Sequence, residues 1–201
     1  EFRRVLFRSL DQGWRRRAVR DLALAPGSVV LDIACGTGDF CIELEHRGLV
    51  PVGIDVSAGM LAHARWKDRL VRTDALALPV PDASVAGMTC GFALRNFTAL
   101  DPFFAEAARV VRPGGRIAFL DVGEPKSRIV RAGHALYFRK IVPFVGGLLS
   151  DKAAYRYLPE STAYLPGRDR LVEMVRQAGF AHVEHRSLGF GASQLITGTR
   201  R

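Results

Sequence analysis

A glycine-rich loop between a predicted strand and a predicted helix is the feature that most limits how this chain can fold. Residues 29–33 form a short and mostly apolar run, as expected of a buried central strand. The sequence continues Ala-Cys-Gly-Thr-Gly over residues 34–38, and Asp39 stands where a helix N-cap is expected. Small residues let a ligand approach backbone N–H groups closely, just before a helix N-terminus. The loop therefore predicts a ligand site, or else only a tight connection between strand and helix.

Strand and helix signals alternate along most of the remaining sequence. Short apolar or β-branched runs end at turn residues, and longer stretches with helical spacing separate them. This alternation predicts an α/β fold, in which a mostly parallel sheet carries helices on both faces. The predicted strands are residues 29–33, 50–54, 70–72, 85–90, 116–120, 182–188 and 194–199, and the predicted helices are residues 14–24, 39–46, 57–68, 101–111 and 168–178.

Two segments depart from this alternation. Residues 126–149 are a long mixture of basic and apolar residues, and we interpret residues 126–165 as an inserted cover over a substrate site. Residues 1–9 have neither a helix cap nor a clean amphipathic period, so we interpret them as a leader that is not part of the natural protein. Residues 10–201 are then expected to form a single domain whose natural N-terminus is missing.

Composition limits the class of protein. The chain has 201 residues, 48% hydrophobic and 24% charged, which is typical of one soluble α/β domain. A net charge of +9 is compatible with a nucleic acid, an anionic membrane or an acidic substrate as partner, and equally with a solvated basic surface. The cysteines are odd in number and lack metal-binding spacing, so we expect reduced thiols in the cytoplasm and no metal site.

Three features follow the first three predicted strands, at the edge where open parallel sheets bind ligands. The first is the loop at residues 34–38. The second is Asp55, whose carboxylate can accept both hydroxyls of a ribose, and the third is Asp74 with Ala75, placed to accept from an adenine amino group. Individually, Asp55 can be a helix cap and Asp74 an ordinary loop acid. Together the three features predict a nucleoside cofactor.

Position 41 separates two kinds of nucleoside-binding fold. A dinucleotide-binding loop prefers a third glycine there, and this chain has Cys41. The D-x-A-x-G-x-G pattern instead resembles the first motif of class I S-adenosyl-L-methionine-dependent methyltransferases, and Pro-Gly-Gly at residues 113–115 resembles a later motif of the same class. On this resemblance the cofactor-binding loop residues are Asp32, Ala34, Gly36, Thr37 and Gly38.

Two further segments carry a more specific resemblance. Gly-Phe-Ala-Leu-Arg-Asn at residues 91–96 and Ala-Tyr-Arg-Tyr-Leu-Pro-Glu-Ser at residues 154–161 resemble signatures of the ubiquinone/menaquinone biosynthesis C-methyltransferase family. The similarity extends over residues 10–199. It implies a Rossmann-like sheet of seven strands with the last antiparallel, and ring methylation of a polyprenyl quinol. It also implies contacts to S-adenosyl-L-methionine from Thr37, Asp55, Asp74, Ala75 and Gly91.

Arg95 and Asn96 are the candidate catalytic residues. A quinol carbon becomes nucleophilic when a ring hydroxyl ionises, and a nearby cation lowers the pKa of that hydroxyl. We therefore assign phenolate stabilisation to Arg95 and orientation of the ring oxygen to Asn96, although the first can also be an ion-pair partner and the second a turn cap. Tyr137, Tyr155 and Tyr157 are candidate substrate contacts, with core packing as the alternative.

The expected substrate also sets the expected partners. A polyprenyl quinol resides in the bilayer, and residues 129–149 combine basic with apolar side chains, which favours peripheral contact with the inner face of the membrane. The same residues can instead form the floor of the substrate pocket. A homodimer is left open, and nucleic acid is not expected because no N-P-P-[YF] motif follows the fourth predicted strand. The alternatives are a methyltransferase of another small molecule and a truncated cofactor-binding protein without activity.

Overall fold

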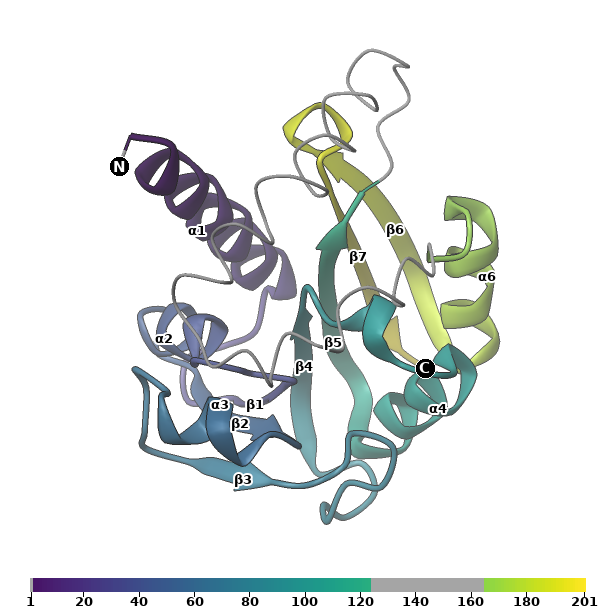
Figure 1. Ribbon diagram of the computed structural model, residues 1–201. Helices are drawn as coiled ribbons and strands as arrows, with labels where there is room; N and C mark the ends of the chain where they lie inside the picture. Colours follow the sequence, from purple (N-terminus) through teal and green to yellow (C-terminus); the bar gives the residue numbers. More distant parts are fainter. Residues whose placement is uncertain (1, 124–164) are drawn as a thin grey trace.

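The computed structural model describes residues 2–123 and 165–201, which build a twisted sheet with helices on both faces (Figure 1). The sheet has seven strands in the order β3-β2-β1-β4-β5-β7-β6, and β7 runs antiparallel to both of its neighbours. The predicted fold class is therefore confirmed. The strands are β1 (Val29–Ile33), β2 (Val50–Asp55), β3 (Leu70–Arg72), β4 (Val85–Gly91), β5 (Val111–Val122), β6 (Phe180–Leu188) and β7 (Ser193–Arg200).

Alternation of side chains along the central strands creates an apolar surface on each face of the sheet. On β5, Ile117 and Phe119 belong to one core cluster, whereas Ala118 and Leu120 belong to the other, as a period of two requires. Helices α4 (Leu100–Val110) and α6 (Arg168–Gln177) cover the first face, and α1 (Phe2–Leu22) and α2 (Asp39–Glu45) cover the second (Figure 1). The short elements are α3 (Ala58–Ala62), η1 (Leu94–Asn96) and η2 (Gly189–Gly191).

The register of the parallel strands brings three strand ends to one level. Ile33, near the end of β1, pairs with Ile54 of β2 on one side and with Cys90 of β4 on the other. The residues that follow these three positions are Ala34, Asp55 and Gly91. Because the strand order reverses between β1 and β4, the carboxyl edge there is the crevice in which such sheets place ligands.

The helix predicted at residues 57–68 is wrong at its C-terminal end. Its start is confirmed, because the Ser57 hydroxyl accepts a hydrogen bond from the backbone N–H of Met60 at 3.2 Å. The helix ends at Ala62, however, since the chain then turns toward the glycine-rich loop. The Arg65 N–H donates to the Thr37 carbonyl at 2.9 Å, and Trp66 is buried at 5% exposure. Tertiary contacts thus end a helix that local spacing alone would continue.

The N-terminal helix is longer than the predicted range of residues 14–24. It begins at Phe2, so residues 2–9 continue α1 as helix. Arginine and leucine favour helix, and no proline interrupts the segment. That residues 1–9 are not natural stays a prediction.

The predicted cover at residues 126–165 lies outside the described residues, apart from Leu165. Of the helices that the structure describes, none combines the length and the apolar character needed to cross a bilayer.

Candidate functional site

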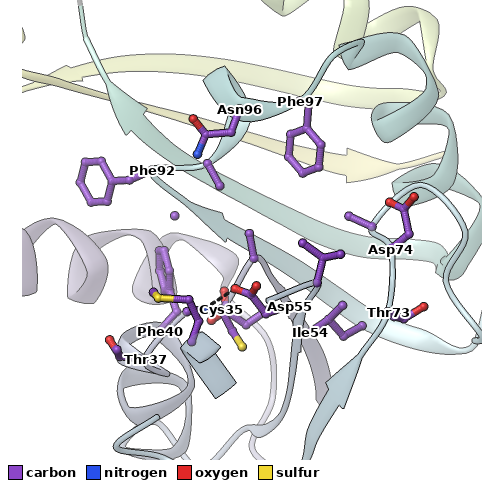
Figure 2. Close-up of a pocket in the computed structure, with 18 of the residues that line it drawn as sticks. Cys35, Thr37, Phe40, Ile54, Asp55, Thr73, Asp74, Phe92, Asn96 and Phe97 are labelled. Atoms are coloured by element: carbon purple, nitrogen blue, oxygen red, sulfur yellow. Dashed lines mark hydrogen bonds between the residues drawn. The ribbon is translucent and has the colours of Figure 1, made fainter. Parts of the chain in front are cut away.

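A cavity of about 630 Å³ lies at the carboxyl edge of the sheet, between the ends of β1, β2 and β4 (Figure 2). Its wall combines acidic side chains, backbone of the glycine-rich loop and apolar side chains. Three segments far apart in the sequence meet there, since residues near positions 34, 55 and 92 follow three neighbouring strands. The predicted location of the ligand site is therefore where the structure has a cavity.

The glycine-rich loop turns sharply and is held from two sides. Ala34, Gly36 and Gly38 all have positive φ, at 53°, 55° and 83°. A Cβ on Gly38 would lie 2.9 Å from the Cβ of Trp66, so both backbone conformation and space require glycine there. Gly38 is not part of the cavity wall. It serves as the N-cap residue of α2, a position that the sequence analysis assigned to Asp39.

Asp55 connects the end of β2 to this loop. One carboxylate oxygen accepts the N–H of Gly36 at 2.9 Å, and the other accepts the N–H of Ser57 at 2.8 Å. The side chain is nearly buried, at 8% exposure, yet it lines the cavity. Each carboxylate oxygen can accept more than one hydrogen bond, so Asp55 retains capacity toward a pair of ligand hydroxyls.

Asp74 lies in the loop after β3, on the same cavity wall as Ala75. Its Oδ1 accepts the N–H of Leu76 at 2.9 Å, which is a local turn of the kind aspartate commonly makes. The side chain is exposed. Asp74 thus stabilises the turn of its own loop through Oδ1. Its Oδ2 accepts no hydrogen bond from the residues that the structure describes.

Asp32 is a buried carboxyl group on the inner wall of the cavity. It is 1% exposed, and it accepts the Thr89 hydroxyl at 2.9 Å and the Cys41 thiol at 3.6 Å. Burial raises its pKa to about 7, and the Thr89 hydrogen bond and the nearby Arg15 charge only partly oppose this rise. A cation bound beside Asp32 would stabilise its ionised form.

The segment 91–96 places its two candidate catalytic residues differently. Asn96 lines the cavity, whereas Arg95 does not (Figure 2). The Arg95 guanidinium donates from Nη1 to Asp121 at 2.6 Å, and the Asp121 side chain is fully buried at the end of β5. Burial raises the pKa of Asp121, and the Arg95 charge opposes that rise. An ion pair was the alternative interpretation of Arg95 from the sequence, and the structure supplies its acidic partner from β5.

The structure brings together most of the predicted site residues. Tyr137, Tyr155 and Tyr157 lie outside the described residues. Three further cavity residues, Arg15, Phe40 and Phe92, were not predicted as site residues from the sequence, and only Phe92 lies in a segment with a recognisable signature, residues 91–96. The predicted residues on the cavity wall are Asp32, Ala34, Gly36, Thr37, Asp55, Asp74, Ala75, Gly91 and Asn96.

The fold and the cavity together define the class. A seven-stranded sheet of this order, with a glycine-rich loop after β1 and an acid after β2, is the Rossmann-like fold of class I methyltransferases. Among solved structures, an S-adenosylmethionine-dependent methyltransferase from Thermotoga maritima matches with a TM-score of 0.70 at 20% identity, over 99% of this chain and 93% of that one. A phosphoethanolamine N-methyltransferase from Haemonchus contortus matches with a TM-score of 0.69 at 14% identity, over 94% of this chain and 52% of that one.

Sequence relatives narrow the class to a family. The pattern of the ubiE/COQ5 methyltransferase family matches residues 4–200, and the chain belongs to this family. It is 41% identical to a demethylmenaquinone methyltransferase of Deinococcus radiodurans, over 98% of this chain and 86% of the relative. It is 34% identical to a ubiquinone/menaquinone biosynthesis C-methyltransferase UbiE of Geobacter sulfurreducens, over 98% of this chain and 82% of the relative.

Asp32 gives the protein a specific pH dependence of stability. Because its folded pKa is raised, this group stabilises the fold fully below about pH 4, and the contribution is lost as pH rises toward about 7. Asp32→Asn removes the titration. We expect the free energy of unfolding of the wild type, minus that of the variant, to fall by on the order of a few kcal/mol between pH 4.5 and 7.5. Urea unfolding across this range measures the difference, and parallel pH profiles would contradict it.

Proposed function

We propose that this chain is an S-adenosyl-L-methionine-dependent C-methyltransferase that methylates the ring of a polyprenyl quinol. Its substrate is either demethylmenaquinol, which becomes menaquinol, or the methoxy-polyprenyl-benzoquinol of ubiquinone synthesis. One observation carries the proposal. Asn96, from one of the two segments that carry the specific resemblance to the family, lines the same cavity as the carboxylates Asp55 and Asp74.

The residues of the cavity fit the proposed cofactor. Asp55 and Asp74 supply acceptors at the ends of β2 and β3, where ribose hydroxyls and an adenine amino group need them. Val56 and Met60, at 67% and 45% exposure, are apolar side chains on the wall next to Asp55 and suit the flat face of a base. The Gly36 backbone approaches the same space, because a Cβ there would lie 3.1 Å from the Met60 Cε.

The protein itself must activate the methyl acceptor, which is the quinol ring. When bound, the cofactor supplies a methyl group that is already electrophilic, so the ring must be made nucleophilic. We propose that the Asn96 amide orients a ring hydroxyl and that the neighbouring Arg95 charge lowers its pKa, with a bridging water removing the proton. Alignment of the reacting atoms in a site closed to water supplies most of the acceleration.

Turnover of the two quinols with isotope-labelled S-adenosyl-L-methionine, followed by mass spectrometry, tests the proposal. We expect labelled methyl groups on one of the two rings. Asn96→Ala should lower kcat by about 100-fold, as loss of one positioned donor does elsewhere, and should leave cofactor affinity unchanged. Cofactor binding without methylation of either ring would overturn the assigned substrate class.

A mutational test of Arg95 needs a matched control variant, because Arg95 also forms an ion pair with the buried Asp121. Arg95→Ala leaves Asp121 without its partner, which should lower the free energy of unfolding by on the order of 2 kcal/mol. Adding Asp121→Asn should restore that stability. If Arg95 lowers the hydroxyl pKa, the double variant stays inactive at neutral pH and regains turnover at alkaline pH. Full activity of the double variant at neutral pH would make Arg95 purely structural.

We further propose that the protein contacts anionic membranes reversibly, since a polyprenyl quinol is reached at the bilayer. The chain's net charge of +9 supports attraction to such a surface. Flotation of the whole chain with vesicles of phosphatidylcholine and phosphatidylglycerol should carry it upward at low salt, and less so at high salt. A protein that stays at the bottom of the gradient at low salt would refute this contact.

A further inference from the structure

Arg15 is a cation on the cavity wall, supplied by α1 and not by a strand end. Its side chain is only 12% exposed. The guanidinium carbon lies 4.9 Å from the ring centre of Phe40 and 5.3 Å from that of Phe92, so two aromatic rings hold it in place. Both rings belong to the cavity wall as well. The charge is therefore fixed in position and largely removed from bulk water.

The hydrogen bonds of Arg15 leave most of its donors unused. Its Nε donates to Asp11 at 3.1 Å, one helical turn earlier. Among the side chains that the structure describes, those of residues 11–123 and 165–201, none accepts a hydrogen bond from Nη1 or Nη2. A guanidinium fork with two such nitrogens can bind a carboxylate in a bidentate manner.

Gly91 makes room for this fork at the end of β4. A Cβ at this position would lie 2.8 Å from the Arg15 Nη1 and 2.7 Å from the Phe40 ring, so any larger residue would displace the guanidinium. Its φ is not in the left-handed region, and space alone explains the glycine. This observation places Nη1 directly against the strand end that borders the cavity.

An opposite charge lies on the same part of the wall. Asp32 is close enough to Arg15 for the guanidinium to lower the pKa of its carboxyl group. Asp55, the last residue of β2, and Asp74, in the loop after β3, belong to strands on the other side of β1. The cavity thus has a zwitterionic end, formed by Arg15 and Asp32, and an acceptor end, formed by Asp55 and Asp74.

We propose that Arg15 binds the α-carboxylate of the amino-acid portion of S-adenosyl-L-methionine. The inference rests on the proposed cofactor and deepens it by fixing its direction in the cavity. The amino-acid portion of this molecule is a zwitterion, so its carboxylate faces Arg15 while its ammonium faces Asp32. The adenosine portion then extends toward Asp55 and Asp74.

A purely structural role is the competing explanation, because Arg15 also forms an (i, i+4) pair with Asp11. The chain offers a matched control. Arg17 forms the same kind of pair with Asp21 at 3.0 Å on the same helix, but it is 39% exposed and is not part of the cavity wall. Arg17→Gln therefore reports what loss of an (i, i+4) arginine on α1 does away from the cavity, with Asp21 keeping its contact to Arg186.

Calorimetric titration with two ligands that differ only in the carboxylate tests the assignment. The ligands are S-adenosyl-L-methionine and decarboxylated S-adenosylmethionine, and the proteins are the wild type, Arg15→Gln and Arg17→Gln. We expect Arg15→Gln to raise the Kd for S-adenosyl-L-methionine by roughly 10- to 100-fold, as loss of a charge-assisted pair does, with the Kd for the decarboxylated ligand nearly unchanged. Arg17→Gln should change neither affinity.

Binding of the decarboxylated ligand also shows that the variant is folded. An Arg15→Gln variant that loses affinity for both ligands equally, or for neither, would overturn the role of Arg15 while leaving the proposed cofactor intact. A wild-type protein that binds neither ligand would instead overturn the proposed cofactor, and this inference with it.

Discussion

The site depends on the hydrogen bonds that join the ends of β1 and β2. The Asp55 carboxylate accepts the Gly36 N–H at 2.9 Å, and the Cys35 N–H donates to the Ile54 carbonyl at the same distance. These bonds hold the glycine-rich loop against the neighbouring strand, so the loop backbone and the acid form one rigid wall. Without them the positive-φ turn would keep only its contacts to Arg65 and Trp66 on the other side of the loop.

The positions of the charged residues around the cavity do not follow from the sheet topology alone. Asp32 is buried where ionisation is unfavourable, and it is placed near Arg15, which α1 brings in from outside the sheet. The other charged pair joins Arg95, within η1, to Asp121 near the end of β5, and so ties the turn that contains Asn96 to the sheet. The first pair suits the zwitterionic end of the proposed cofactor, and the second supports Asn96, which we propose contacts the quinol.

The sequence allowed prediction of those features that follow from chain order. Parallel strands bring their carboxyl ends to one edge, so Asp55 and Asp74 were predictable from their positions directly after strands. Arg15 was not, because it stands among three consecutive arginines and only the packing of α1 across the sheet decides which of them reaches the cavity. The Arg95–Asp121 pair spans 26 positions in the sequence and likewise depends on tertiary contact. The end of α3 was mispredicted for the same reason, since Trp66 turns inward against the glycine-rich loop.

A crystal structure of the protein with S-adenosyl-L-homocysteine bound is the most direct test of the account. We expect the ligand in the cavity at the carboxyl edge of β1, β2 and β4, with its ribose hydroxyls on Asp55 and its carboxylate on the Arg15 guanidinium. A ligand bound in the reverse direction, or bound at another surface, would contradict it. Either of those results would show that the charges on this wall serve the fold and not the cofactor.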